Sequence, residues 1–426
     1  MSGNDDIIIT GLSFFRILWY TVEEVIDLKR IFALLMVMMI LLSGCGKPAA
    51  DDNKPQEPVQ EQNQPAQNAD TETEEVPQTE AAEPATEATE PAFDPYAIMA
   101  EMTVEEKIGQ LFLARCPGVE EGADDVQQYH LGGYILFGRD FDDQSIGAMQ
   151  RTISEYQAAA KIPLLIAVDE EGGTVNRVSS HSQFRESSFP SPRKLYGEGG
   201  LELVLETEKE KCMLLTALGI NVNMAPVCDI TTNSGAFMYS RSLGESPEVT
   251  GDYIANMVKT MSAYNVGGVL KHFPGYGNNA DTHVQIAVDS RSLEELTSYD
   301  LVPFQSGIDA GCDAILVSHT IVECLDDELP ASLSPDVIHH LRNVMGFDGV
   351  VVTDDLKMAA ITDQYGTGEA AVMAIQADAD LLCSSYYWTQ YNAVLEAYYD
   401  GRISQAEIED SVVRILNWKH ELGLID

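Results

Sequence analysis

The chain has 426 residues, 45% of them hydrophobic, and its formal net charge at pH 7 is −43. This hydrophobic content is enough for a large core, such as that of an α/β barrel of about 250 residues or more. The acidity argues against a nucleic-acid partner, because phosphate contacts need Lys and Arg. It fits a protein kept soluble at an outer surface, although an acidic solvated surface with no special role is the simpler explanation.

The N-terminal segment, residues 1–45, carries a secretion pattern. Lys29 and Arg30 precede the apolar run 31–42, and small residues lead to Cys45. A positive stretch, a short apolar stretch and small residues before the cut are typical of a secretory signal. The run is shorter than the roughly 20 residues of a membrane-spanning helix. An uncleaved anchor is the alternative, and the unusual length of residues 1–28 suggests a mis-assigned start codon.

Because Cys45 falls at the cut, this segment resembles a bacterial lipoprotein signal. The resemblance implies that Cys45 is the lipidated first residue of the mature chain, anchored on the outer face of a bacterial cell membrane. Residues 46–92 are rich in Pro, Glu, Gln, Thr and Ala. Such a segment buries too little apolar surface to offset its ordering entropy, so a disordered spacer is predicted before a folded domain at 93–426.

The remaining cysteines show no paired spacing. Several of them end or interrupt apolar runs, so we expect mostly reduced, small core residues, although an exported chain could pair them. No CxxC motif or His/Cys cluster indicates a metal site. These cysteines are Cys116, Cys212, Cys228, Cys312, Cys324 and Cys383.

From about Asp94 the pattern becomes globular. The stretch 102–108 predicts a helix start, with Thr103 as N-cap and Glu106 three residues later. Short apolar runs then alternate with helical stretches, and two helices are expected at 388–400 and 405–422. The eight runs are Gln110–Arg115, Gly133–Phe137, Pro163–Val168, Val222–Val227, Val266–Leu270, Ala314–Val317, Gly349–Val352 and Ala379–Leu382.

Runs this short and apolar suit strands buried on both faces of a parallel sheet. Eight of them alternating with helices predict a single (β/α)8 barrel. A doubly wound open sheet is the competing fold, but no GxGxxG follows the first run. Polar residues stand directly after several runs, where barrel sites are built. They are Asp169-Glu170-Glu171, Asp229, Lys271-His272, Ser318-His319 and Thr353-Asp354-Asp355.

Asp354 follows the seventh run, so its carboxylate is expected at the barrel mouth. An ionised carboxylate there could attack an anomeric carbon or stabilise positive charge on it. A buried structural Asp or a helix N-cap is the alternative. The neighbouring Asp355 is predicted to cap a helix that begins near Leu356.

Residues 271–283 read KHFPGYGNNADTH, and the glycines open a loop that carries Asp281 and His283. The pKa of a histidine is about 6.5, so it can hold or release a proton near neutrality. A nearby carboxylate orients the ring and favours its charged form. The pair is therefore a candidate proton-transfer unit, although the spacing is common. A metal role lacks a third ligand at a suitable spacing.

Three further positions could bind a ligand. Asp169 and Arg177 lie on either side of a Gly-Gly turn and could hydrogen-bond sugar hydroxyls, or form a salt-bridged loop instead. Arg241, in the sequence YSRSLG, is either a ligand-binding guanidinium or a structural clamp.

The motifs D-x-E-G-G, SRSLG, KHFPGYG with D-x-H, and TDDL occur in this order over about residues 95–425. Together they resemble glycoside hydrolase family 3, and within it the bacterial β-N-acetylglucosaminidases. The resemblance implies Asp354 as nucleophile, His283 as general acid/base and Asp281 as its partner. It further implies that the N-acetylglucosamine at the cleaved end is bound by Asp169, Arg177, Arg241, Lys271 and His272.

The implied activity is a retaining, cofactor-free exo-β-N-acetylglucosaminidase for cell-wall fragments or chitooligosaccharides. Family 3 β-glucosidases usually take their acid/base carboxylate from a second domain, which this chain lacks. Another β-glycosidase of the family and a non-catalytic sugar-binding lipoprotein remain alternatives. A histidine in place of a carboxylate leaves the site less negative, so phosphorolysis is a further alternative.

Overall fold

A computed structural model of the chain describes residues 93–277 and 287–426. Cys45, the predicted spacer 46–92 and the pair Asp281 and His283 lie outside the described residues. Among the helices of the described part, none is long and apolar enough to cross a membrane.

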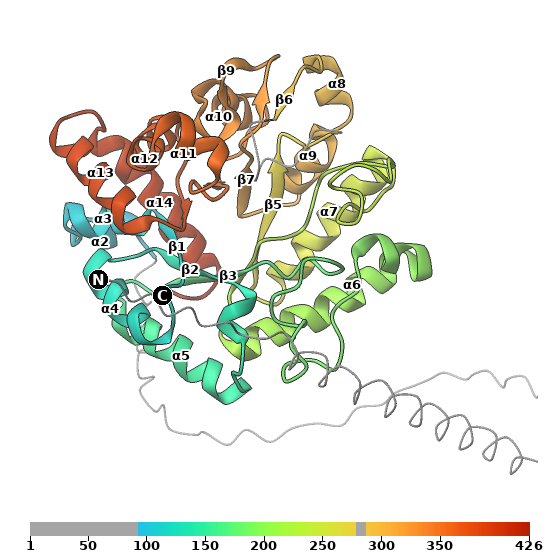
Figure 1. Ribbon diagram of the computed structural model, residues 1–426, viewed down its shortest axis with the longest axis horizontal. Helices are drawn as coiled ribbons and strands as arrows, with labels where there is room; N and C mark the ends of the chain where they lie inside the picture. Colours follow the sequence, from blue (N-terminus) through green and yellow to red (C-terminus); the bar gives the residue numbers. More distant parts are fainter. Residues whose placement is uncertain (1–92, 278–286) are drawn as a thin grey trace, which may run out of the picture. The chain divides into compact units, whose positions relative to one another are not determined.

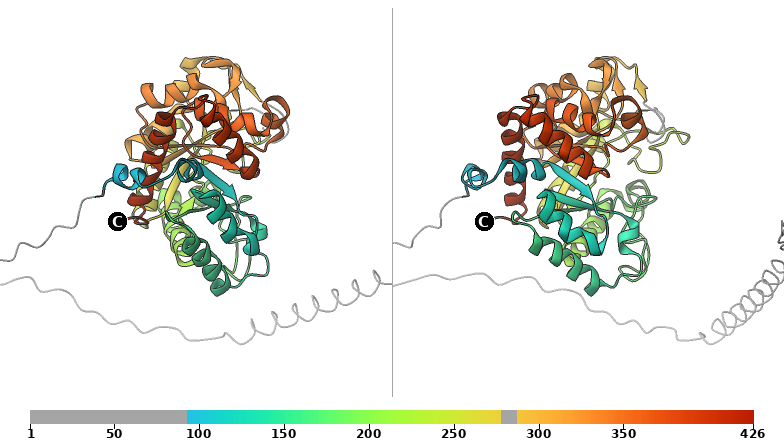
Figure 2. Two further views of the ribbon diagram at one scale, coloured as in Figure 1. Left: turned by 90° about the vertical axis from the view of Figure 1, so that its left-hand side faces the viewer. Right: turned by 60° about the vertical axis from the view of Figure 1, so that its left-hand side comes forward.

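Eight parallel strands form the central sheet, and helices pack outside them (Figures 1 and 2). Their spatial order is β10-β7-β5-β4-β3-β2-β1-β11. The sheet closes where Thr353 N donates to Leu381 O at 3.0 Å, beside a parallel bridge between Val352 and Leu381. The predicted (β/α)8 barrel is confirmed. The strands are β1 Phe112–Arg115, β2 Gly133–Leu136, β3 Leu165–Val168, β4 Val222–Asn223, β5 Gly267–Phe273, β7 Ala314–Val317, β10 Val350–Thr353 and β11 Leu382–Ser384.

Most connections between strands contain one or more helices. They are α2 Pro95–Ala100, α3 Val104–Gln110, α4 Val119–Tyr129, α5 Ile146–Ala159, α6 Pro192–Leu218, α7 Pro247–Ser262, α8 Leu293–Ser298, α9 Leu301–Asp309, α10 Pro335–His339, α11 Ala359–Tyr365, α12 Thr367–Gln376, α13 Tyr387–Tyr399 and α14 Gln405–Glu421. The predicted capping box at the start of α3 is confirmed, with Thr103 and Glu106 in the expected positions.

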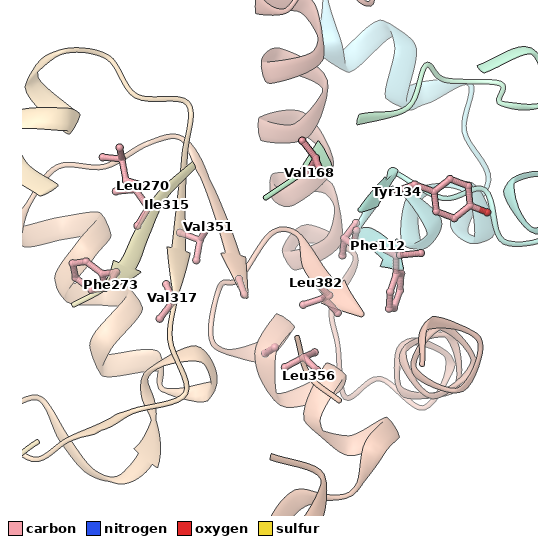
Figure 3. Close-up of a cluster of buried hydrophobic side chains, with 14 of the residues drawn as sticks. Phe112, Tyr134, Val168, Leu270, Phe273, Ile315, Val317, Val351, Leu356 and Leu382 are labelled. Atoms are coloured by element: carbon pink, nitrogen blue, oxygen red, sulfur yellow. The ribbon is translucent and has the colours of Figure 1, made fainter. Parts of the chain in front are cut away.

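Side chains on both faces of the strands are buried, as the apolar runs predict. The outer face packs against the helices through side chains such as Phe112, Val168 and Ile315 (Figure 3). The inner face forms a separate cluster with the end of α14. A Cβ on Gly267, at the start of β5, would lie 2.8 Å from the Trp418 ring, so α14 closes the N-terminal end of the barrel. The opposite end is left for a site.

Two expectations need correction. Strand β5 continues through Phe273, so Lys271 and His272 lie inside the strand and not after it. The helix after β10 begins at Ala359, and its N-cap Met358 makes no side-chain bond, so Asp355 does not cap it.

A second sheet escapes the sequence pattern. It contains β6 Val288–Asp289, β8 Ile321–Val322 and β9 Asp326–Pro330, which are too short to show a period of two. The six cysteines of the described part are unpaired, and all but Cys324 are buried, in agreement with their expected role as core residues.

Candidate active site

A cavity of about 510 Å³ opens at the carboxyl ends of the barrel strands. Its lining includes every predicted site residue that the structure describes, namely Asp169, Arg177, Arg241, Lys271, His272 and Asp354. These residues lie up to 185 positions apart in the chain, from Asp169 to Asp354, and the folding of the barrel brings them together. Asp281 and His283 are not placed, because they lie outside the described residues.

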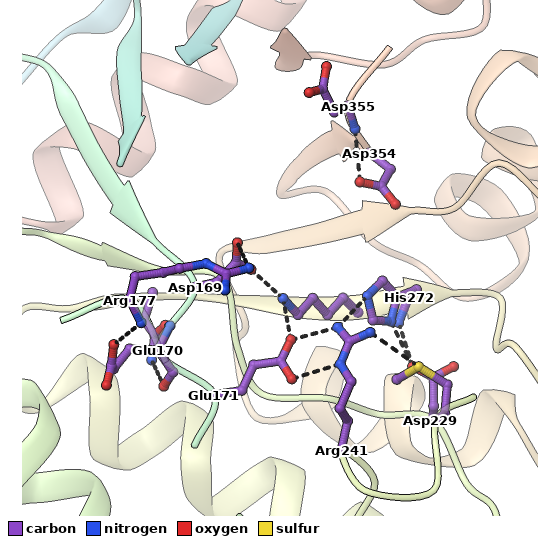
Figure 4. Close-up of polar contacts among 12 residues, drawn as sticks. Asp169, Glu170, Glu171, Arg177, Asp229, Arg241, His272, Asp354 and Asp355 are labelled. Atoms are coloured by element: carbon purple, nitrogen blue, oxygen red, sulfur yellow. Dashed lines mark hydrogen bonds and ion pairs between the residues drawn. The ribbon is translucent and has the colours of Figure 1, made fainter. Parts of the chain in front are cut away.

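Glu171 is the centre of an ion-pair network on one wall of this cavity (Figure 4). Lys271 Nζ lies 2.7 Å from Glu171 Oε1 and 2.7 Å from Asp169 Oδ1. Arg241 contacts both oxygens of Glu171, through Nε at 2.9 Å and Nη2 at 2.7 Å. The Glu171 carboxylate is only 3% exposed. The two cations are therefore fixed in place before any ligand arrives.

Burial opposes the charge on Glu171, but Lys271 and Arg241 outweigh it and hold the pKa of Glu171 far below its usual range. Burial likewise disfavours the ammonium of Lys271, yet Asp169 and Glu171 raise its pKa. Glu171, Lys271 and Arg241 are consequently charged at neutral pH. Fixed charges that are buried interact strongly with the hydroxyl and amide groups of a bound ligand.

Hydrogen bonds fix the tautomer of His272. Arg241 Nη2 can only donate, and it lies 3.1 Å from His272 Nε2, so that nitrogen accepts. His272 Nδ1 then carries the proton and donates to Asp229 Oδ2 at 2.8 Å. Asp229 also accepts the backbone N–H of His272 and of Tyr276. Both ring nitrogens are therefore engaged by protein, and His272 acts as an orienting group for Arg241.

The turn after β3 is organised by Glu170. Its carboxylate accepts the backbone N–H groups of Arg177, Val178 and Ser179 at 2.8, 2.7 and 3.1 Å. Gly172 and Gly173 adopt φ angles of +101° and +69°, which bears out the tight turn that the sequence predicts. This turn points the Arg177 guanidinium toward Asp169, with Nη2 3.8 Å from Oδ2.

Asp354 follows β10 directly, and its Oδ1 accepts the backbone N–H of Asp355 at 2.8 Å. Asp355 binds across to the loop after β11 and not to a helix. It accepts the N–H of Ser385 at 3.0 Å and the Ser385 hydroxyl at 2.5 Å. Asp355 thus joins two loops at the mouth and holds the peptide group that orients Asp354.

Sequence reasoning missed the roles of Glu171, Asp229 and Arg291. The first two stand after strands, and that position is the only signal the sequence offers. Arg291 ties β6 to the end of β5: it contacts both oxygens of Asp289, its Nη1 lies 2.5 Å from Asp300, and its Nη2 donates to Gly275 O at 3.4 Å. Burial raises the pKa of Asp300 to about 6, against the effect of Arg291.

In the described part of the chain, no group of three or more His, Cys, Asp or Glu side chains is placed to bind a metal ion. The cavity is lined by fixed cations and by Asp354, whose carboxylate is held by a neighbouring peptide group. This arrangement can hold a polar, hydroxyl-rich ligand against a nucleophilic oxygen.

The sequence profile described as "Glycosyl hydrolase family 3 N terminal domain" matches residues 103–418. Beta-hexosaminidase LpqI of Mycobacterium tuberculosis is 32% identical over 344 residues, which cover 76% of this chain and 85% of that protein. A beta-hexosaminidase of Stenotrophomonas maltophilia is 37% identical over 248 residues, covering 56% of this chain and 71% of that protein.

Solved structures agree with these matches. A family 3 β-N-acetylglucosaminidase from Paenibacillus sp. FPU-7 superimposes with a TM-score of 0.71 at 34% identity, covering 76% of this chain and 63% of that chain. The structure of M. tuberculosis LpqI also gives a TM-score of 0.71, at 29% identity, covering 77% of this chain and 96% of that chain.

Proposed function

Since this chain belongs to glycoside hydrolase family 3, we propose that it is a retaining exo-β-N-acetylglucosaminidase. Its substrates would be peptidoglycan fragments or chitooligosaccharides with a terminal β-linked N-acetylglucosamine. The observation that carries the proposal is the Asp169–Lys271–Glu171–Arg241 network on the wall of the cavity that Asp354 lines. The named activities of the similar proteins support it.

The proposed reaction has two displacements. A carboxylate oxygen of Asp354 attacks the anomeric carbon, and the bond to the leaving oxygen breaks as His283 protonates that oxygen. His283, oriented by Asp281, then takes a proton from water, which attacks the glycosyl-enzyme and releases Asp354. The hydrogen bond from Asp355 N to Asp354 Oδ1 helps to orient this carboxylate.

The fixed cations are proposed to hold the sugar ring. Lys271 and Arg241 would donate to hydroxyl groups, and Asp169 would accept from one, because each already has a defined direction in the ion-pair network. Arg177 would close the same side of the ring. His272 lines the cavity but has both ring nitrogens engaged, so its part is to keep Arg241 oriented.

A direct assay separates the candidate functions. We expect hydrolysis of 4-nitrophenyl β-N-acetylglucosaminide and little hydrolysis of the matching β-glucoside. A preference for the glucoside would assign the chain to another β-glycosidase of the family. Binding of N-acetylglucosamine without turnover would indicate a sugar-binding lipoprotein. Formation of a sugar 1-phosphate when inorganic phosphate is added would indicate a phosphorylase.

Replacing His283 with alanine should lower kcat by roughly 10²–10⁴-fold, because both steps lose proton transfer. The loss should be largest for substrates with poor leaving groups and smallest where the leaving group needs no proton. Measuring kcat for a series of aryl N-acetylglucosaminides checks this. An equal loss across the series would point to a positioning role and contradict the assignment.

Gly277 precedes the segment that carries Asp281 and His283. Its φ is +55°, and a Cβ there would lie 2.7 Å from Cζ of Arg291. Gly277→Ala should therefore displace Arg291 and lower kcat/KM by about 10- to 100-fold, because misplaced acid/base groups slow the reaction. It should also lower the free energy of unfolding by about 1–2 kcal/mol.

Gly311→Ala is the matched control, since Gly311 also has a positive φ, +83°, but no atom within 4 Å of its added Cβ. Gly311→Ala should lower the free energy of unfolding but leave kcat/KM unchanged. Equal losses of kcat/KM in both variants would show that displacement of Arg291 does not matter.

The chain organisation is proposed as a signal over 1–45, a spacer over 46–92 and the catalytic barrel over 93–426. Lipidation of Cys45 would anchor the enzyme on the outer face of a bacterial membrane. Mass spectrometry of the mature N-terminus tests this, because an unmodified Cys45 within a longer chain would refute both cleavage and anchoring.

A further inference from the structure

Arg115 is a cation in the cavity that the ion-pair network does not use. It is the last residue of β1, and its side chain lines the cavity. Its guanidinium carbon lies 4.5 Å from the centre of the Phe137 ring. Arg115 Nε is buried and has no hydrogen-bond partner among residues 93–277 and 287–426. Arg241 and Lys271, by contrast, are both paired with buried Glu171.

Asp140 is an acidic residue that interacts electrostatically with Arg115, and it is engaged by other groups. Arg115 helps to lower the pKa of Asp140, although burial wins and raises that pKa. Asp140 accepts the N–H of Phe137 at 2.7 Å and lies 3.6 Å from Arg139. No carboxylate of the described residues lies within the 4.0 Å ion-pair distance of Arg115.

A guanidinium with no ion-pair partner among the described residues is unusual in a chain with a net charge of −43. The guanidinium lies over the Phe137 ring, and a guanidinium in such a contact can still donate hydrogen bonds from its planar N–H edge. That edge matches the two oxygens of a carboxylate, with two parallel hydrogen bonds. Inside a cavity such a pair is stronger than on a surface, because less water screens it.

We propose that Arg115 is a specificity-determining residue that binds a carboxylate of the substrate, on the group joined to the terminal N-acetylglucosamine. This inference rests on the proposed function and narrows the range of its substrates. A sugar that carries a carboxylate, joined to the terminal N-acetylglucosamine, would be preferred over a neutral one. Inorganic phosphate could meet the same guanidinium. A carboxylate is favoured because Asp169, Asp354 and Asp355 line the same cavity and repel a dianion more than a monoanion.

A matched pair of substrates tests this. The wild-type enzyme is assayed with 4-nitrophenyl and 3-carboxy-4-nitrophenyl β-N-acetylglucosaminide, and the ratio of their kcat/KM values is compared with that of Arg115→Gln. The ratio should fall by about 10-fold or more in the variant, the usual range for a charge-assisted hydrogen bond. Arg115→Lys keeps the positive charge but cannot form two parallel hydrogen bonds to one carboxylate. It should retain part of the preference for the carboxylated substrate.

Arg139→Gln is the control, because Arg139 is half-exposed and does not line the cavity. Its ratio should equal that of the wild type. If the wild type cleaves both substrates and Arg115→Gln leaves the ratio within about twofold, the inference is overturned while the proposed function stands. If the wild type cleaves neither substrate, the proposed function fails and the inference with it.

An assay with added inorganic phosphate distinguishes binding of a substrate carboxylate from binding of phosphate. With inorganic phosphate present, no sugar 1-phosphate should form. Formation of that product by the wild type, and its loss in Arg115→Gln, would assign the guanidinium to phosphate and overturn the carboxylate. If Arg115→Gln does not fold, as shown by its thermal melt, the comparison of Arg115→Lys with the wild type decides: an unchanged ratio there also overturns the inference.

Discussion

Asp354→Ala is expected to lower kcat on 4-nitrophenyl β-N-acetylglucosaminide by about 10⁴-fold or more, with the thermal melt near that of the wild type. The loss is large because the variant has no oxygen to form the glycosyl-enzyme, so both displacements disappear. The fold should persist, because the backbone N–H of Asp354 still donates to Val317 O at 3.1 Å and holds the end of β10.

Added azide should restore turnover in this variant. The small anion can enter the space of the lost carboxylate, attack the anomeric carbon from that side and expel the leaving group, which His283 protonates. The product would be the α-glycosyl azide. Asp348→Ala, at an exposed aspartate just before β10, is the control and should behave as the wild type. Near-normal turnover of Asp354→Ala would disprove the nucleophile assignment.

Glu171→Gln should be the most destabilising of the proposed site substitutions, lowering the free energy of unfolding by about 3–5 kcal/mol. The glutamine keeps the shape but leaves Lys271 and Arg241 buried beside each other without their shared anion. Sugar binding should fail as well, since both cations lose their direction. Urea unfolding and KM measurements check the two effects. Glu210→Gln, which removes an exposed pair with Arg185, should cost at most about 1 kcal/mol.

The same pair of proteins has a predictable pH dependence. The pKa of Glu171 is lowered in the folded state from an ordinary value of 4.5, so its ionised form stabilises the fold above that pH. The stability gap between wild type and Glu171→Gln should therefore be constant from about pH 6 to pH 8 and should narrow as the pH falls below 4.5. An equal gap at pH 3 and pH 7 would mean that the Glu171 charge does not act through this network.

Local patterns in the chain predicted the barrel and the location of Asp354 at its mouth. Each buried strand is a short apolar run whose pattern depends only on neighbouring residues, and a polar residue directly after such a run marks the mouth of a barrel. For the same reason the start of α3 was predictable, because its capping box involves residues three positions apart. The very short strands β6, β8 and β9 carry too few residues for any pattern.

Only the tertiary structure decided which side chains meet. Glu171 is one of three acidic residues in a row, and nothing local shows that it alone lies between Lys271 and Arg241, about 100 and 70 residues away. Asp355 joins Ser385 because β10 and β11 close the barrel. From the sequence, Arg115 is only the polar end of an apolar run. The structure shows that it packs on Phe137 and has no ion pair within residues 93–277 and 287–426. Which side chains form ion pairs and which are buried depends on the order and register of the strands, and these bring together residues that are far apart in the chain.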